Sequence, residues 1–200
     1  ADMAGGAVKT GEYTLPGYRH DWAAMNLSLF GGSAFFKAHS ADLIKHGLEF
    51  APVANPFCSA FPDGTWCGVS TDLAASTARI AALSAQDAET WGNLCAGFGA
   101  EAPHLFGLLG SPMKMRAIAY FMLKLLRAKG VCGALDMGRF LVASPRSWLT
   151  ETFQSDQMRA MLAAWGMHLD FAPDIAGGAL FPYLEGMANQ SFGMVLGKGG

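Results

Sequence analysis

The sequence predicts an α+β fold in which a small antiparallel sheet is followed by a layer of helices. Three observations predict it. Short β-prone runs occur at 48–53 and 57–69 and are bounded by turn residues. Residues 71–166 carry four helix-start signals, each with a capping residue. Glycine-rich sequence with short apolar runs returns in 176–200, which indicates extended structure.

The segment before the first β-prone run is predicted to be extended and then helical. Residues 11–22 contain a Pro-Gly pair, which resists helix, among aromatic residues that favour strands. Residues 34–46 form the first predicted helix, with Ser33 as its N-cap. Gly47 is expected to end that helix in the left-handed conformation. The run at 57–69 contains Pro-Asp-Gly-Thr at its centre, which predicts a hairpin.

Helix starts are marked by a capping residue followed by a proline or by an acidic residue. The starts expected are Thr71-Asp72, Ser84 with Asp87, Ser111-Pro112 and Ser144-Pro145. Pro103 and nearby glycines predict a kink in the second of these helices. A last helix after Ser155 is expected to stop at Gly166. The apolar runs 180–183 and 192–196 are interpreted as strands or close-packed loop.

Composition excludes several classes of function. The chain is 52% hydrophobic, only 15% charged and carries a net charge of −2, which argues against nucleic-acid binding. Its four cysteines have neither C-x-x-C spacing nor a paired histidine motif, so no metal site is expected. We expect the cysteines to be reduced thiols in a cytoplasmic protein. No hydrolase or metalloprotease motif occurs. The apolar excess instead indicates an apolar pocket, a membrane-surface contact or an uncovered interface.

A diglycine near the start is the first candidate binding feature. Gly5 and Gly6 lack side chains, so their backbone N–H groups can approach a phosphate closely, and Thr10 follows them. An ordinary flexible chain start is the alternative. No G-x-G-x-x-G motif occurs, and we therefore expect the chain to be an excerpt of a longer protein.

The segment Gly5-Gly6-Ala7-Val8-Lys9-Thr10, taken with Leu15-Pro16-Gly17-Tyr18-Arg19-His20-Asp21, resembles the phytoene desaturase-like FAD-dependent oxidoreductases. These belong to the amine oxidase-like flavoproteins, and the subgroup named for a pyridine nucleotide-disulphide oxidoreductase domain is the most similar. The stretches 163–173 and 176–183 extend the resemblance over the whole chain. One departure is Ala7, where many carotenoid desaturases have an arginine that pairs with pyrophosphate.

The resemblance implies FAD as cofactor and an apolar small-molecule substrate. Residues 1–25 would then be a remnant of the FAD-binding domain, 26–175 a mostly helical substrate domain, and 176–200 a return segment toward the FAD domain. The FAD-binding Rossmann half would be mostly absent, and the chain alone inactive. Gly5, Gly6 and Thr10, with Gly177 and Gly178, are the implied cofactor contacts.

Two further features leave alternatives open. His168 follows a helix stop and is a weak catalytic candidate, although a histidine beside aromatic residues is also typical of a core. Residues 112–130 combine apolar positions with five cations and no acid, which predicts a basic amphipathic helix. Such a helix can contact a membrane surface, line an apolar tunnel or pack as an ordinary core helix.

Two functions from different classes follow from these features. The preferred one is a fragment of an FAD-dependent oxidoreductase that transfers hydride from an apolar substrate to the flavin. The alternative is a non-catalytic module that binds lipid or a partner protein, with a chaperone-like or scaffolding role as a further variant.

Overall fold

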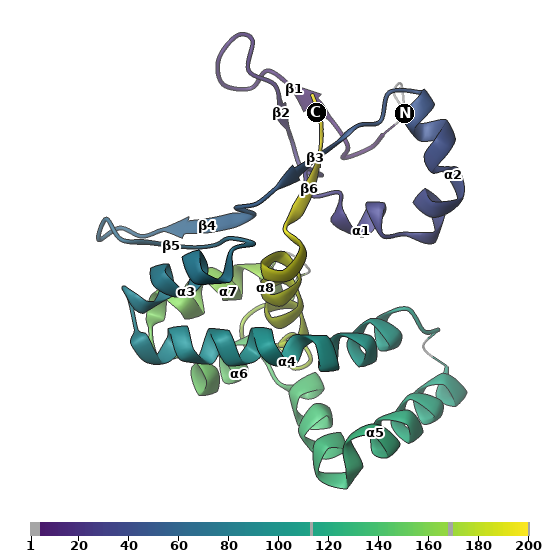
Figure 1. Ribbon diagram of the computed structural model, residues 1–200, viewed down its shortest axis with the longest axis vertical. Coiled ribbons are helices and arrows are strands. Elements are labelled where there is room, and N and C mark those ends of the chain that lie inside the picture. Colours follow the sequence, from purple (N-terminus) through teal and green to yellow (C-terminus); the bar gives the residue numbers. More distant parts are fainter. Residues whose placement is uncertain (1–4, 113, 168–169, 200) are drawn as a thin grey trace. The chain divides into compact units, whose positions relative to one another are not determined.

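The computed structural model describes residues 5–112, 114–167 and 170–199 (Figure 1). It is a mixture of helices and small antiparallel sheets, which confirms the predicted α+β class. The chain forms two compact units. Unit 1 consists of Ala1–Pro56 with Phe192–Gly200, and unit 2 consists of Phe57–Ser191.

Unit 1 opens with a pair of very short strands, not with the continuous extended segment predicted at 11–22. Strands β1 (Thr10–Gly11) and β2 (His20–Asp21) pair antiparallel. Between them the chain turns, with the N–H of Tyr18 donating to the carbonyl of Leu15. Gly17 has a φ of 84°, a conformation that glycine adopts without a steric penalty, so the Pro-Gly pair reverses the chain at this point.

The rest of unit 1 follows the prediction. After the short helix α1 (Ser28–Gly31), helix α2 (Ala34–Lys45) begins at Ser33, whose Oγ accepts from the N–H of Phe36 at 3.1 Å. Gly47 follows the end of α2 with a φ of 96°. Strand β3 (Phe50–Val53) then pairs antiparallel with β6 (Met194–Gly197). The run predicted as a strand at 48–53 is confirmed, and of the two alternatives at 192–196 the structure has the strand.

Unit 2 begins with the predicted hairpin and continues as helices. Strands β4 (Phe57–Ala60) and β5 (Trp66–Val69) pair across a turn in which Asp63 accepts from Thr65. The helices are α3 (Leu73–Ala81), α4 (Ala85–Leu109), α5 (Met115–Val142), α6 (Pro145–Thr152), α7 (Asp156–Met167) and α8 (Leu180–Phe192). The side chains of Asp72, Ser84 and Ser144 cap α3, α4 and α6 as predicted.

Two predictions about the helices are wrong, and one helix ends a residue later than predicted. Helix α5 begins after Lys114 without a side-chain cap, because the Ser111 hydroxyl donates back to the carbonyl of Gly107 at the end of α4. The helix at 156–167 runs through Gly166, which lies in its last turn against Pro145. Residues 180–183 are the first turn of α8, not a strand or loop.

Helix α8 forms because its apolar residues repeat at helical spacing and most of them are buried in the core of unit 2. Leu180, Tyr183, Leu184 and Met187 each have an exposed fraction of 7% or less. Pro182 stands in the first turn, where a backbone N–H has no partner within the helix, so it does not interrupt the ladder. In the sequence, the surrounding glycines and this proline make the helical repeat of the apolar residues hard to recognise.

The core of unit 2 joins α4 and α8 around a buried tryptophan. The indole N–H of Trp91 donates to Gln190 Oε1 at 3.0 Å, and Gln190 Nε2 donates to the carbonyl of Ser70 at 2.7 Å. Gly186 leaves room for the Trp91 ring, since a Cβ there would lie 3.2 Å from it. Within the described residues, no helix has the length and apolar character needed to cross a membrane.

Candidate functional site

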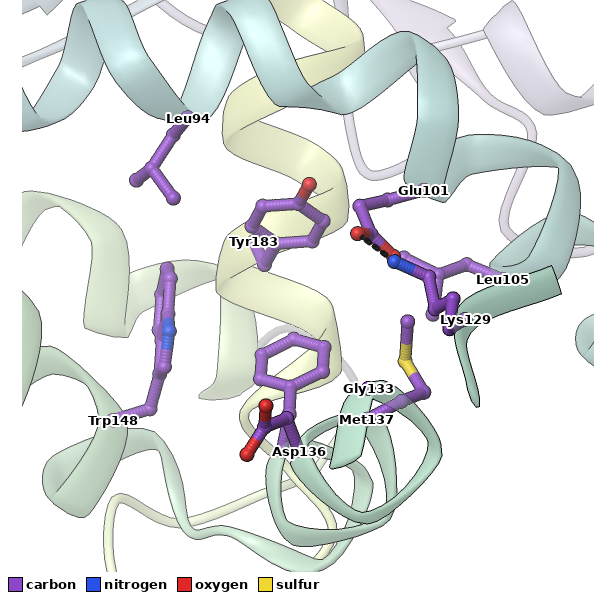
Figure 2. A pocket seen from close by; sticks show the side chains of 10 residues that line it. Leu94, Glu101, Leu105, Lys129, Gly133, Asp136, Met137, Trp148 and Tyr183 are labelled. Carbon is purple, nitrogen blue, oxygen red and sulfur yellow. Dashed lines mark hydrogen bonds and ion pairs between the residues drawn. The ribbon is translucent and has the colours of Figure 1, made fainter. Parts of the chain in front are cut away.

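A pocket of about 330 Å³ opens between α4, α5, α6 and α8 (Figure 2). Its walls are mainly apolar and aromatic. Leu94 and Leu105 come from α4 and Met137 from α5. Trp148 from α6 and Tyr183 from α8 also line it. Because the lining side chains come from four helices of unit 2, the fold of that unit positions the pocket. Concave apolar sites with few polar groups are typical of small-molecule binding.

Three aromatic rings form one side of the pocket. Phe140, Trp148 and Tyr183 contact one another edge to face, with ring centroids 5.4–5.9 Å apart. This arrangement is favourable beyond the area that it buries. The three rings therefore present a preformed apolar wall, so a ligand would lose little free energy in ordering it.

Three polar side chains, Glu101, Lys129 and Tyr183, lie together at one end of the pocket, and Asp136 lies apart from them (Figure 2). Glu101 from α4 pairs with Lys129 from α5, and Tyr183 lies between Trp148 and this ion pair (Figure 2). Burial, the charge of Glu101 and the nearby Cys95 raise the pKa of the Tyr183 hydroxyl to about 12. Tyr183 thus remains a neutral O–H group at physiological pH. Burial also raises the pKa of the Cys95 thiol to about 11.

A bend in α5 places its two halves on this pocket. Gly130 has φ 69° and ψ −174°, a combination that is essentially restricted to glycine. Lys129 precedes the bend, and Asp136, Met137 and Phe140 follow it on the pocket wall. At Gly133 a Cβ would come within 2.7 Å of Lys129 Cβ, so this glycine leaves space for the lysine that pairs with Glu101.

The raised pKa values of Tyr183 and Cys95 predict a loss of stability in alkaline solution. The folded state holds both protons above the pH at which the unfolded chain releases them. The contribution is fully present below pH 9, the ordinary pKa of a thiol, and is lost as pH rises toward about 12. Urea unfolding across this range should show a falling free energy of unfolding. The slope should be shallower in Tyr183→Phe, and an equal slope in both proteins would contradict the assignment.

A second cavity of about 310 Å³ adjoins the first through Phe140 and Trp148. Asp136, Arg139 and Glu151 give it a charged lining, and Arg139 pairs with Glu151 at 2.6 Å. The second cavity thus adds charged side chains beside the mainly apolar walls of the first. Within residues 5–112, 114–167 and 170–199, no three potential metal ligands come together.

The residues predicted to hold a phosphate lie at the start of unit 1. Gly5 and Gly6 have φ values of 112° and 57°, and the N–H of Val8 closes a turn on the Gly5 carbonyl. Open space surrounds Gly6, so the turn fits a close approach of a ligand to backbone. Thr10 donates its hydroxyl to Asp21 across the β1–β2 pair at 2.6 Å. Contact with FAD at these residues stays a prediction.

The other predicted diglycine belongs to unit 2 and packs against protein. The N–H of Gly177 is shared between the carbonyls of Val142 and Ala143 at the end of α5. A Cβ at Gly178 would lie 2.9 Å from both Pro145 and Phe171. Gly178 therefore has a packing reason to be glycine, whether or not a cofactor also approaches it.

Replacing Gly178 by alanine is expected to destabilise unit 2 by about 1–3 kcal/mol, because the new methyl group overpacks a rigid proline. Urea unfolding of the chain without added flavin measures this effect. Gly92→Ala is the control, because a Cβ at Gly92 meets no atom within 4 Å. If Gly178→Ala is as stable as Gly92→Ala, the contact with Pro145 does not constrain this position.

The remaining candidate, His168, lies outside the described residues. The pocket residues were not predicted as a site, although Lys129 was noted among the cations of 112–130. The signal in the sequence that could have indicated Tyr183 is the apolar spacing of α8, which places this residue on the buried face.

In comparisons with known proteins, neither a family model nor a curated protein sequence matches the chain.

Proposed function

We propose that unit 2 binds an apolar small molecule in the pocket, as the substrate-binding part of an FAD-dependent oxidoreductase. The observation that supports binding is the preformed aromatic wall of Phe140, Trp148 and Tyr183 around a cavity of about 330 Å³. The oxidoreductase assignment depends on the resemblance of the sequence to the phytoene desaturase-like flavoproteins.

In this proposal the flavin accepts the hydride, and the chain binds and orients the substrate. Phe140, Trp148 and Tyr183 exclude water from the apolar body of the substrate. Gly5 and Gly6 supply backbone N–H groups near the pyrophosphate of FAD, because both glycines adopt positive φ in an exposed turn.

Binding in the pocket is tested with 2-methoxynaphthalene, a neutral aromatic probe, by calorimetry on the 200-residue chain. Trp148→Ala should weaken binding by roughly tenfold or more, because it removes a side chain of the pocket wall. Trp22→Ala is the matched control, since Trp22 is 67% exposed and belongs to unit 1. Absence of probe binding, or equal loss in both variants, would contradict the pocket as the binding site.

The cofactor is tested on the longer protein that this proposal implies. That protein should purify with flavin absorbance close to one FAD per chain. A colourless preparation that takes up no added FAD would contradict the oxidoreductase assignment. The 200-residue chain alone should retain flavin weakly or not at all, and a sub-micromolar dissociation constant for FAD would contradict this expectation.

A second candidate function is attachment to an anionic membrane surface through the first half of α5. Residues 102–135 contain no acidic residue. Leu125 is fully buried, whereas Met115, Met122 and Leu126 remain 80%, 39% and 41% exposed at i, i+7 and i+11. The helix thus has more apolar surface than its packing uses. The exposed cations Arg116, Lys124 and Arg127 lie at i+1, i+9 and i+12 from Met115, on the other side of the helix, so a polar face lies away from the apolar one as in interfacial helices.

Vesicle flotation tests this second function with phosphatidylcholine alone and with added phosphatidylserine. The chain should float only with the anionic vesicles. Reversing Arg116, Lys124 and Arg127 to Glu should lower binding by well over tenfold, since each cation contributes about 1 kcal/mol near such a surface. The control reverses Arg19, Lys37 and Lys45, which are exposed in unit 1. Equal losses in both triple variants would contradict attachment through α5.

A further inference from the structure

We infer that the pocket prefers apolar molecules that carry a hydroxyl group over molecules of the same shape without a hydrogen-bond donor. This inference rests on the proposed binding of an apolar ligand in unit 2. It concerns the polar end of the pocket, where Glu101, Lys129 and Tyr183 meet.

The first observation is an incomplete carboxylate. Glu101 Oε1 accepts from Lys129 Nζ, whereas Glu101 Oε2 is shielded from solvent and accepts no hydrogen bond within the described part of the chain. Buried polar atoms in folded proteins are rarely left without a partner, because the loss of water is then uncompensated. A ligand O–H that donates to Glu101 would supply the missing hydrogen bond.

The second observation is that Lys129 already pairs with the other carboxylate oxygen, Glu101 Oε1. The bend at Gly130 ends the first half of α5 directly after Lys129. Gly133 leaves the space beside Lys129 Cβ that a larger residue would fill, and Lys129 Nζ pairs with Glu101 Oε1. The ammonium group is therefore used by Oε1, and Oε2 has no donor among the described residues.

The third observation is the hydroxyl of Tyr183, which burial keeps protonated and which makes no hydrogen bond to another described residue. A hydroxyl group both donates and accepts, so it can donate to Glu101 and accept from Tyr183 at once. A ligand carboxylate would instead meet the negative charges of Glu101 and Asp136, with Lys129 already paired.

Three naphthalene probes test this preference by calorimetry on the 200-residue chain at neutral pH. They are 2-naphthol, 2-methoxynaphthalene, which keeps the shape but lacks the donor, and 2-naphthoate. A hydrogen bond to a charged acceptor predicts that naphthol binds roughly tenfold more tightly than the methyl ether. Naphthoate should bind most weakly. Equal affinities of naphthol and the ether, or tightest binding of naphthoate, would overturn the inference.

A matched pair of variants locates the effect. Glu101→Gln should reduce the naphthol preference over the ether to within about twofold, since an amide is a weaker acceptor than a carboxylate. Glu89→Gln, on the exposed side of the same helix, should keep the full preference. An unchanged preference in Glu101→Gln would overturn the role of this carboxylate. Failure of all three probes to bind the wild-type chain would instead overturn the proposed apolar binding itself.

Discussion

Replacing Asp87 by alanine is expected to lower the free energy of unfolding by about 3 kcal/mol. Asp87 is fully buried on α4, and its two carboxylate oxygens accept from the backbone N–H groups of Gln154 and Ser155 at 2.7 and 2.8 Å. These groups lie at the junction between α6 and α7. Alanine would leave both donors without their charged acceptor in the interior of unit 2.

Urea unfolding followed by circular dichroism measures this effect. Glu89→Ala is the control, since it lies two residues away on α4 and is exposed. It should change stability by less than about 0.5 kcal/mol. An Asp87→Ala chain that unfolds at the same urea concentration as the control would show that the α6–α7 junction does not depend on this carboxylate.

Replacing Gly130 by alanine is expected to abolish most ligand binding in the pocket. A Cβ at φ 69° and ψ −174° carries strain of about 1–3 kcal/mol, which the chain can relieve by straightening α5. Straightening would move Asp136, Met137 and Phe140 away from the wall and separate Lys129 from Glu101. We expect the affinity for 2-naphthol to fall by roughly tenfold or more.

Gly138→Ala is the control for this change. It lies on the same helix beyond the bend, and a Cβ there meets no atom within 4 Å. Because alanine favours helix over glycine, this variant should be as stable as the wild type or slightly more stable. Retention of wild-type affinity by Gly130→Ala would contradict the role of the bend in shaping the pocket.

Local sequence signals predicted much of the fold of each unit. Ser33, Asp72, Ser84 and Ser144 cap helices because their side chains reach backbone donors two or three residues away. The hairpin at 57–69 likewise depends on a four-residue turn. Such interactions are complete within a few residues, so one sequence is sufficient to predict them.

The pairing of Ser84 with Asp87 illustrates where this reasoning ends. The sequence predicted a capping-box variant, and Ser84 Oγ does accept from the N–H of Asp87 at 3.2 Å. The Asp87 carboxylate, however, accepts hydrogen bonds from the backbone N–H groups of Gln154 and Ser155, which are sixty-seven and sixty-eight residues away in the chain. A local motif cannot reveal a partner that only packing brings near.

The sequence by itself determined the α+β class, most helix starts and the basic, acid-free character of 112–130, because these depend on composition and on neighbours along the chain. Only the tertiary structure decided that 180–183 is helical and that Glu101, Lys129 and Tyr183 share one pocket. The physical reason is that burial and long-range contacts override local preference. The proline and glycines around α8 weaken its local signal, whereas its apolar face is stabilised by the core against which it packs.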